Sequence, residues 1–109
     1  MDLRGIIDVC KEREIYEERY VSDEYFEVVF FHKDVELWTS CLAQFLDSPA
    51  KPAGKLPSKE QMELTSHFGG IRKNQVLFVK ESAESKIIAM FWPWNDDVHV
   101  TLRMAVVHV

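Results

Sequence analysis

The sequence predicts one domain of the α+β class: an antiparallel sheet of four to five strands with helices packed mainly on one face. Three observations predict this class. The chain has 109 residues, the length of a single domain, so we take residues 1–109 as one unit. Runs rich in β-branched and aromatic residues are short, as strands are. These runs lie before and after a block of helix-like segments, which favours an antiparallel sheet over a parallel one.

The N-terminal segment predicts a short helix followed by a strand. Asp2 can cap a helix over residues 3–10, where apolar residues recur on one helical face. These residues are Leu3, Ile6, Ile7 and Cys10. The composition of residues 13–21 favours a longer helix, whereas the even spacing of Tyr16 and Tyr20 suits a polar edge strand. We expect a strand there and keep the helix as the alternative.

The middle of the chain predicts one buried strand and two helices. Residues 25–32 are apolar on both sides of a strand, so both sides need cover. A second helix opens at Asp34 and carries one apolar stripe. The stripe consists of Val35, Trp38, Cys41, Leu42, Phe45 and Leu46. Three prolines and a glycine make residues 48–57 a loop. A capping box at residues 58–61 starts a third helix, and the glycines at 69–70 end it.

Three strands complete the chain. They cover residues 75–80, 86–92 and 98–108. The last strand is apolar along one face, but its other face begins with His99, Thr101 and Arg103. We therefore expect the first half of this strand to face water or a ligand on that side.

The predicted element order is α-β-β-α-α-β-β-β, or α-β-α-α-β-β-β if residues 13–21 are helical. The first order resembles the general plan of PAS-like, profilin-like and roadblock-like domains. This resemblance covers the order of the elements alone, and a shared fold does not establish a shared function.

Charge is distributed unevenly along the chain, whose formal net charge is -5. Residues 1–48 carry twelve Asp and Glu against five Lys and Arg, whereas residues 49–86 carry seven Lys and Arg against four Glu. The acidic first half argues against a nucleic-acid partner, because a polyanion binds a positively charged face. The basic middle of the chain leaves a local anion site open.

The two cysteines, Cys10 and Cys41, are too few for a disulfide framework. Both lie among apolar residues and away from any histidine or glycine-rich elbow, so we expect inert, buried free thiols in a reducing compartment. No run approaches the ~18 apolar residues of a membrane helix, and no signal-peptide pattern is present. We expect a cytoplasmic protein without a membrane partner.

Histidines are the remaining candidates for metal binding or catalysis. None of His32, His67, His99 and His108 pairs with another, or with a cysteine, at the spacing of metal ligands. We therefore expect no metal and no cofactor. A small enzyme that uses His67 or His99 with a nearby acid remains an alternative.

The sequence contains two candidate ligand sites, one for an anion and one for a small molecule. The first is an anion site in which backbone N–H groups and cations would face a carboxylate or phosphate. Its residues are Gly69, Gly70, Arg72 and Lys73. The glycines are more simply explained as a helix stop, because phosphate loops place theirs before a helix. The second is a ligand pocket near His99, Arg103 and the proline-rich loop.

The strongest candidate surface surrounds two tryptophans. Trp92 and Trp94 flank a proline at the end of a strand and fall on the same side of it. The same strand carries Ile88 and Met90 in an unbroken apolar run. We expect the second and third helices to cover one sheet face and the short first helix to cover part of the other. Apolar surface left over there would meet a second copy of the chain, unless the first helix covers all of it. The two copies would join through this second face or through an edge strand.

These features predict a non-catalytic binding or protein-interaction module that acts as a homodimer in the cytoplasm. The partner-binding residues would be Trp92, Trp94, Ile88 and Met90. The alternatives are a small-molecule or anion-sensing domain and the small enzyme mentioned above.

Overall fold

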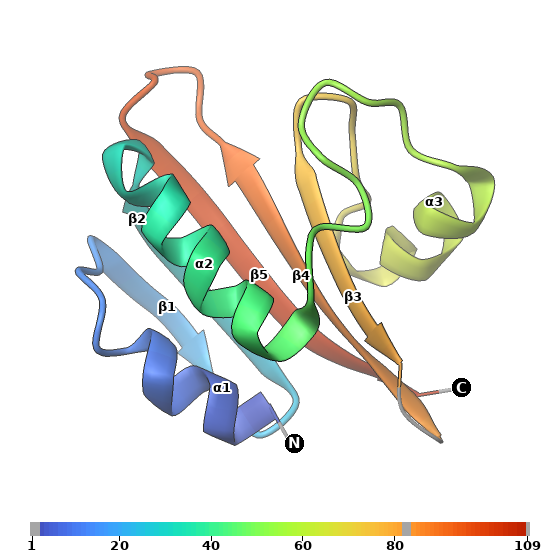
Figure 1. Cartoon of the computed structure of the whole chain (residues 1–109), viewed down its shortest axis with the longest axis horizontal. Coiled ribbons are helices and arrows are strands. Elements are labelled where there is room, and N and C mark those ends of the chain that lie inside the picture. Colours follow the sequence, from blue (N-terminus) through green and yellow to red (C-terminus); the bar gives the residue numbers. More distant parts are fainter. Residues whose placement is uncertain (1–2, 82–83, 109) are drawn as a thin grey trace.

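The computed structural model describes residues 3–81 and 84–108 and shows one open sheet of five antiparallel strands with three α-helices (Figure 1). The helices are α1 (Leu3–Cys10), α2 (Val35–Leu46) and α3 (Lys59–Thr65). The strands are β1 (Glu17–Val21), β2 (Tyr25–Phe31), β3 (Val76–Glu81), β4 (Ser85–Pro93) and β5 (His99–His108). Two 3-10 turns, η1 (His32–Asp34) and η2 (Ser66–Phe68), adjoin α2 and α3.

The α+β class and the element order agree with the prediction. The strand expected over residues 13–21 forms only at residues 17–21. The capping residue Asp2 lies outside the described residues.

The strands lie in the order β1-β2-β5-β4-β3, and every neighbouring pair is antiparallel. β2, β5 and β4 are therefore interior strands, each paired on both edges. Pro93 is tolerated in β4 because β3 pairs with that strand only as far as Phe91. The next residue, Trp94, donates its backbone N–H to His99 of β5. The Pro93 nitrogen thus faces the side on which β3 has already ended.

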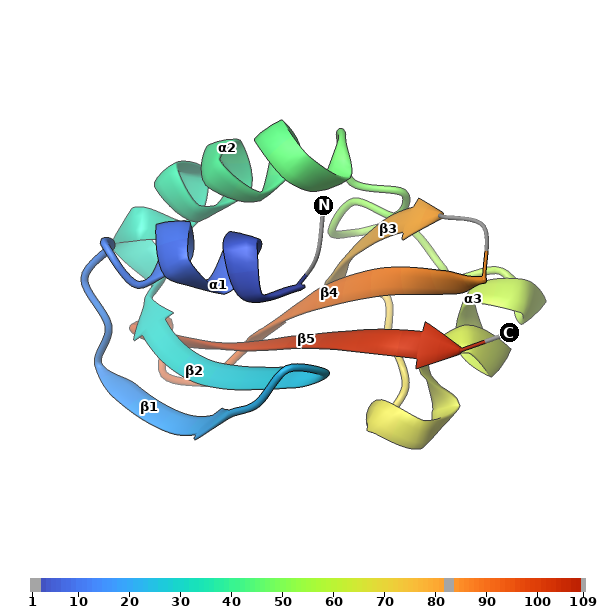
Figure 2. The same cartoon turned by 90° about the horizontal axis from the view of Figure 1, so that it is seen from below.

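Helices α1 and α2 together cover one face of the sheet, which we call the first face (Figure 2). Trp38 of α2 is fully buried and stacks on Phe30 of β2, with ring centroids 4.8 Å apart. Cys10 of α1 and Cys41 of α2 are free, buried thiols, as predicted. Burial raises the pKa of the Cys10 thiol far above its ordinary value, which keeps this thiol protonated. The larger of the two apolar clusters lies in this layer.

The opposite face, which we call the second face, is covered at one end by α3 and the residues that follow it (Figure 2). Leu64, Phe68 and Ile71 pack there against Ile88 and Met90. The expectation that the second and third helices share one face while the first covers part of the other is wrong, because α1 shares a face with α2 and α3 lies on the opposite one. The short segment after α1 folds this helix back beside α2, and the proline-rich loop carries the chain around the edge of β3 before α3 begins (Figure 1).

Both edges of the sheet are protected against further strand pairing. The β1 edge is short and charged, and its register with β2 shifts between Glu18 and Tyr20, as at a β-bulge. The β3 edge is covered by the proline-rich loop, because Lys51 forms an antiparallel bridge with Leu77. Asp47 extends this cover through an ion pair of 2.9 Å with Lys80.

The third helix begins and ends as the sequence predicts. The Ser58 hydroxyl accepts a hydrogen bond from the Gln61 backbone N–H, and the Gln61 side chain accepts one from the Ser58 backbone N–H. The helix tightens into η2 and stops at Gly69, whose φ of 96° lies in the left-handed region. Among the described residues, no helix is long and apolar enough to cross a membrane.

Candidate functional site

The second face is left without a helix where β1, β2 and the first half of β5 lie side by side (Figure 2). Side chains from the strands and turns cover this part of the sheet instead, so Val29 and Thr101 beneath them are buried. We call this area the aromatic surface. It consists of Tyr16, Arg19, Tyr20, Phe31, Trp94 and His99.

Three rings of the aromatic surface pack around His99, whereas the Tyr20 ring contacts Tyr25. The centroid of this imidazole lies 4.3 Å from that of Tyr16, 4.7 Å from that of Trp94 and 5.8 Å from that of Phe31. The Trp94 indole donates a hydrogen bond of 2.8 Å to the Thr101 hydroxyl, which fixes its ring against β5. These contacts hold the three rings and the imidazole in fixed positions.

Asp96 orients His99 from the turn between β4 and β5. Its carboxylate oxygen Oδ2 lies 2.6 Å from His99 Nδ1, and Oδ1 accepts hydrogen bonds from the backbone N–H groups of Val98 and His99. The hydrogen bond with His99, followed by that from Val98, lowers the pKa of Asp96 to about 2. The structure thus joins one of the two predicted catalytic histidines to an acid. The other, His67, is exposed in η2 and bonds to none of the described side chains.

A network of carboxylates and arginines borders the rings. Glu27 accepts a hydrogen bond from the Tyr25 hydroxyl and lies 3.5 Å from Arg19 Nη1 and 3.2 Å from Arg103 Nε. Arg19 also bonds to Glu17 at 2.6 Å, which raises the pKa of its guanidinium. Its guanidinium carbon lies 5.6 Å from the ring centroid of Trp94. Both arginines are therefore held in fixed positions.

Trp92 lies at the boundary between the covered and uncovered halves of the second face. The Arg103 guanidinium carbon lies 4.0 Å from its ring centroid, and Arg103 also donates a hydrogen bond to the Phe68 carbonyl. A Cβ at Gly69 would lie 2.2 Å from the Trp92 ring, so only glycine fits there. Trp92 and Arg103 therefore hold η2 against the sheet. The two residues of the predicted ligand pocket, Arg103 and His99, lie on opposite sides of this boundary.

The structure does not bring the other predicted binding residues together on a surface. Ile88 and Met90 have no exposed surface, since α3 and the following residues cover them, so they cannot contact a partner in this conformation. In the predicted anion loop, Gly70 donates its N–H to the Thr65 carbonyl and Arg72 donates its N–H to the Gln75 side chain. These two backbone donors are thus engaged within the chain.

Tyr16, Arg19 and Glu27 were not predicted as site residues. The sequence could have indicated Glu27, because it is an acidic residue inside an apolar strand and faces the same side as Tyr25. Its partner Arg103 lies directly opposite in β5, but that register becomes visible only in the folded sheet.

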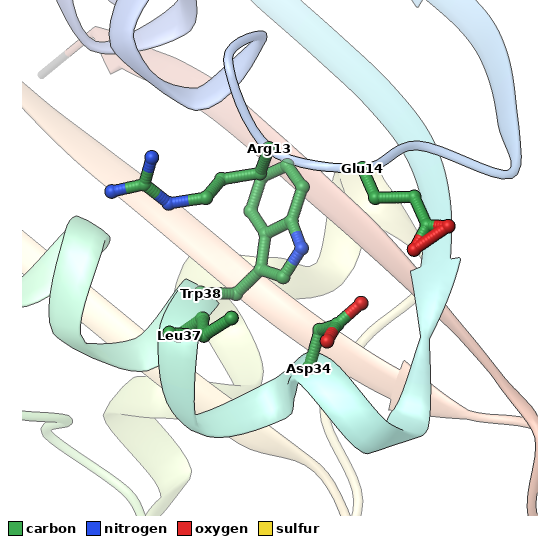
Figure 3. Close-up of a pocket in the computed structure, with 5 residues that line it drawn as sticks. All are labelled: Arg13, Glu14, Asp34, Leu37 and Trp38. Atoms are coloured by element: carbon green, nitrogen blue, oxygen red, sulfur yellow. The ribbon is translucent and has the colours of Figure 1, made fainter.

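Two surface cavities lie outside the aromatic surface, although Lys33 connects the first of them to its rim. One, of about 230 Å³, lies between the segment after α1 and the start of α2 and is lined by Arg13, Glu14, Asp34, Leu37 and Trp38 (Figure 3). The other, of about 200 Å³, lies between α3 and the β3 edge. Within residues 3–81 and 84–108, no three side chains of His, Cys, Asp or Glu are placed to hold a metal ion.

Comparison with known proteins adds no further assignment. No protein family, no curated protein and no solved structure matches this chain.

Proposed function

We propose that the chain is a non-catalytic protein-interaction module that forms a homodimer through the aromatic surface. One observation carries the proposal. The second sheet face is covered by a helix at one end only, and the uncovered part consists of aromatic rings and an arginine held in fixed positions.

The residue types of this surface support a protein partner. Tyrosine, tryptophan and arginine are the side chains that most often dominate binding energy at protein interfaces. Tyr16 and Tyr20 expose about half of their surface, at 51% and 56%. Because their neighbours already fix the rings, little conformational entropy remains to be lost on association.

The charges around the surface support a second copy of the same chain as the partner. Arg19 and Lys33 contribute positive charge, and Glu17 and Asp96 contribute negative charge, all at the rim of the rings. A twofold interface places a patch against itself, so a patch of mixed sign can pair its own cations with its own anions. A patch of one sign would repel its copy.

The state of the sheet edges also favours association through the face. The prediction allowed a dimer through the second face or through an edge strand. The charged β1 edge and the loop-covered β3 edge leave little backbone for a further strand, so the face remains. The two free thiols suit the cytoplasm that we include in the proposal, because reducing compartments keep thiols unpaired.

Sedimentation equilibrium over a range of concentrations tests the proposal. The wild-type chain should show a monomer–dimer equilibrium. Tyr16→Ser and Arg19→Glu should each raise the dimer dissociation constant by about tenfold or more, the effect of losing an interface hot spot. Both side chains are exposed, so both variants should fold, which circular dichroism checks.

Leu56→Ser is the matched control, because Leu56 is 71% exposed but lies in the proline-rich loop, away from the aromatic surface. It should leave the dissociation constant unchanged. A wild-type mass that stays monomeric at every concentration would overturn the proposal. A dimer that both surface variants leave intact would overturn it as well.

A further inference from the structure

The cavity beside Trp38 combines an apolar floor with two carboxylates. Trp38 and Leu37 of α2 contribute the apolar part, and Glu14 and Asp34 contribute the acidic groups. Its volume of about 230 Å³ lies below the ~300–1,000 Å³ of sites for drug-sized ligands, so a molecule of few atoms would fit. Figure 3 shows that Glu14 and Asp34 place their carboxylates on one side of the Trp38 ring, whereas the Arg13 side chain extends in the opposite direction.

Trp38 supplies a hydrogen-bond donor that has no acceptor among the described residues. The side chain has no exposed surface, and its indole nitrogen Nε1 is buried without a hydrogen-bond partner. A buried N–H group without a partner is costly, and such groups in folded proteins nearly always find an acceptor. Figure 3 shows the nitrogen-bearing edge of the ring turned toward the side on which Glu14 and Asp34 lie.

Among the described residues, Asp34 makes few contacts that satisfy its carboxylate, although its side chain is only 18% exposed. It stands at the N-terminus of α2 but makes no side-chain hydrogen bond that caps the helix. Its carboxylate contacts Lys33 at 3.7 Å, and Lys33 also reaches Glu14 at 3.3 Å. The Lys33 side chain is 67% exposed, so these ion pairs are weak and screened by salt. Both carboxylates are therefore available to another cation that displaces Lys33.

The charge of the surrounding chain selects the sign of the ligand. The charged residues of the lining are Glu14, Asp34 and Arg13, and the Arg13 side chain extends away from the two carboxylates. The surrounding residues 1–48 carry twelve acidic against five basic side chains. This negative field attracts cations, and the two carboxylates at the cavity provide a place for an ammonium group. The unpaired indole N–H can in addition donate a hydrogen bond to a ligand oxygen that lies close to that cation.

We propose that this cavity binds a small organic cation that carries a hydroxyl or carbonyl oxygen next to its ammonium group. The oxygen accepts the hydrogen bond of the Trp38 indole, and the ammonium pairs with Asp34 and Glu14 in place of Lys33. The site shares no lining residue with the aromatic surface, although Lys33 borders both. Ligand binding and dimer formation are measured separately, so either proposal can fail alone.

Proton–nitrogen NMR correlation spectra of the ¹⁵N-labelled full chain test this site. The three tryptophans give three indole N–H signals, which can be assigned separately. Ethanolamine and glycinamide should each move the Trp38 signal in a saturable way and leave the Trp94 signal in place. Ethylamine, which has the cation but no acceptor oxygen, should not produce the downfield shift of a new hydrogen bond.

Asp34→Asn should weaken the apparent affinity for ethanolamine by about tenfold, because a charge-assisted contact is lost. Glu36→Gln is the matched control, since Glu36 is an exposed acid of α2 outside the cavity, and it should leave the affinity unchanged. A Trp38 signal that neither probe moves at roughly 50 mM, well above the millimolar range expected for so small a ligand, would overturn the proposal. An equal effect of the two variants would also overturn it.

Discussion

Asp96 and His99 form a polar contact that organises the turn between β4 and β5. One carboxylate accepts from two backbone N–H groups and contacts the imidazole, so three interactions depend on a single side chain. The sequence predicts the turn at residues 95–97 from its composition, but it does not show which of the two aspartates makes these contacts. The fold decides this, because Asp97 adopts a positive φ of 58° while Asp96 faces β5.

Asp96→Asn should destabilise the protein in a pH-dependent way. The pKa of Asp96 is about 2 in the folded chain against an ordinary 3.8, so the folded state favours the ionised form. The stabilisation is therefore present above pH ~4 and disappears as the pH falls toward 2. Urea unfolding should show the variant to be less stable than wild type at pH 7 and nearly equal to it at pH 2. Asp97→Asn, the matched control, should show no such pH-dependent difference.

At the scale of elements, the end of α3 shows how local and tertiary requirements combine. The capping box and the two glycines predict both ends of this helix from local chemistry alone. The glycines are not equivalent in the folded chain, however. Both have positive φ angles, of 96° at Gly69 and 82° at Gly70, but only Gly69 lies against another side chain, the Trp92 ring.

Gly69→Ala should therefore cost more stability than Gly70→Ala. At Gly70 an added Cβ meets nothing within 4 Å, so the cost is the backbone strain of about 1–2 kcal/mol. At Gly69 the Trp92 ring must also move, which adds about 1–3 kcal/mol, as overpacking does. Chemical denaturation measures both changes. Equal losses in the two variants would contradict the close packing of Gly69 on Trp92.

At the scale of the whole molecule, Lys51 holds the proline-rich loop against the sheet edge. The residue is 1% exposed, and its ammonium group donates to the backbone carbonyls of Pro52, Lys73 and Gln75. Burial lowers the pKa of this lysine, while the three carbonyls satisfy all of its N–H donors. Composition predicted a loop here but gave no reason to place one of its lysines in the interior.

Lys51→Met should destabilise the fold by roughly 2 kcal/mol or more, because buried carbonyl groups lose their donor. Lys55→Met, in the exposed part of the same loop, should change stability by less than about 0.5 kcal/mol. Thermal and urea unfolding compare the two variants. The loss of Lys51 should also loosen the cover of β3 and increase aggregation, which light scattering detects. A Lys51 variant with wild-type stability would contradict this role.

The sequence by itself determined the elements, because hydrophobic periodicity, capping residues and turn residues act within a few positions of one another. It therefore predicted the α+β class, the element order, the buried free thiols and a strand within residues 13–21. The tertiary structure decided which helix covers which face, since this depends on how a loop passes an edge of the sheet. It also decided the aromatic surface, because contacts such as Glu27 with Arg103 join residues that are far apart in the chain. Side chains meet across strands only once the register is set, and the register belongs to the whole sheet.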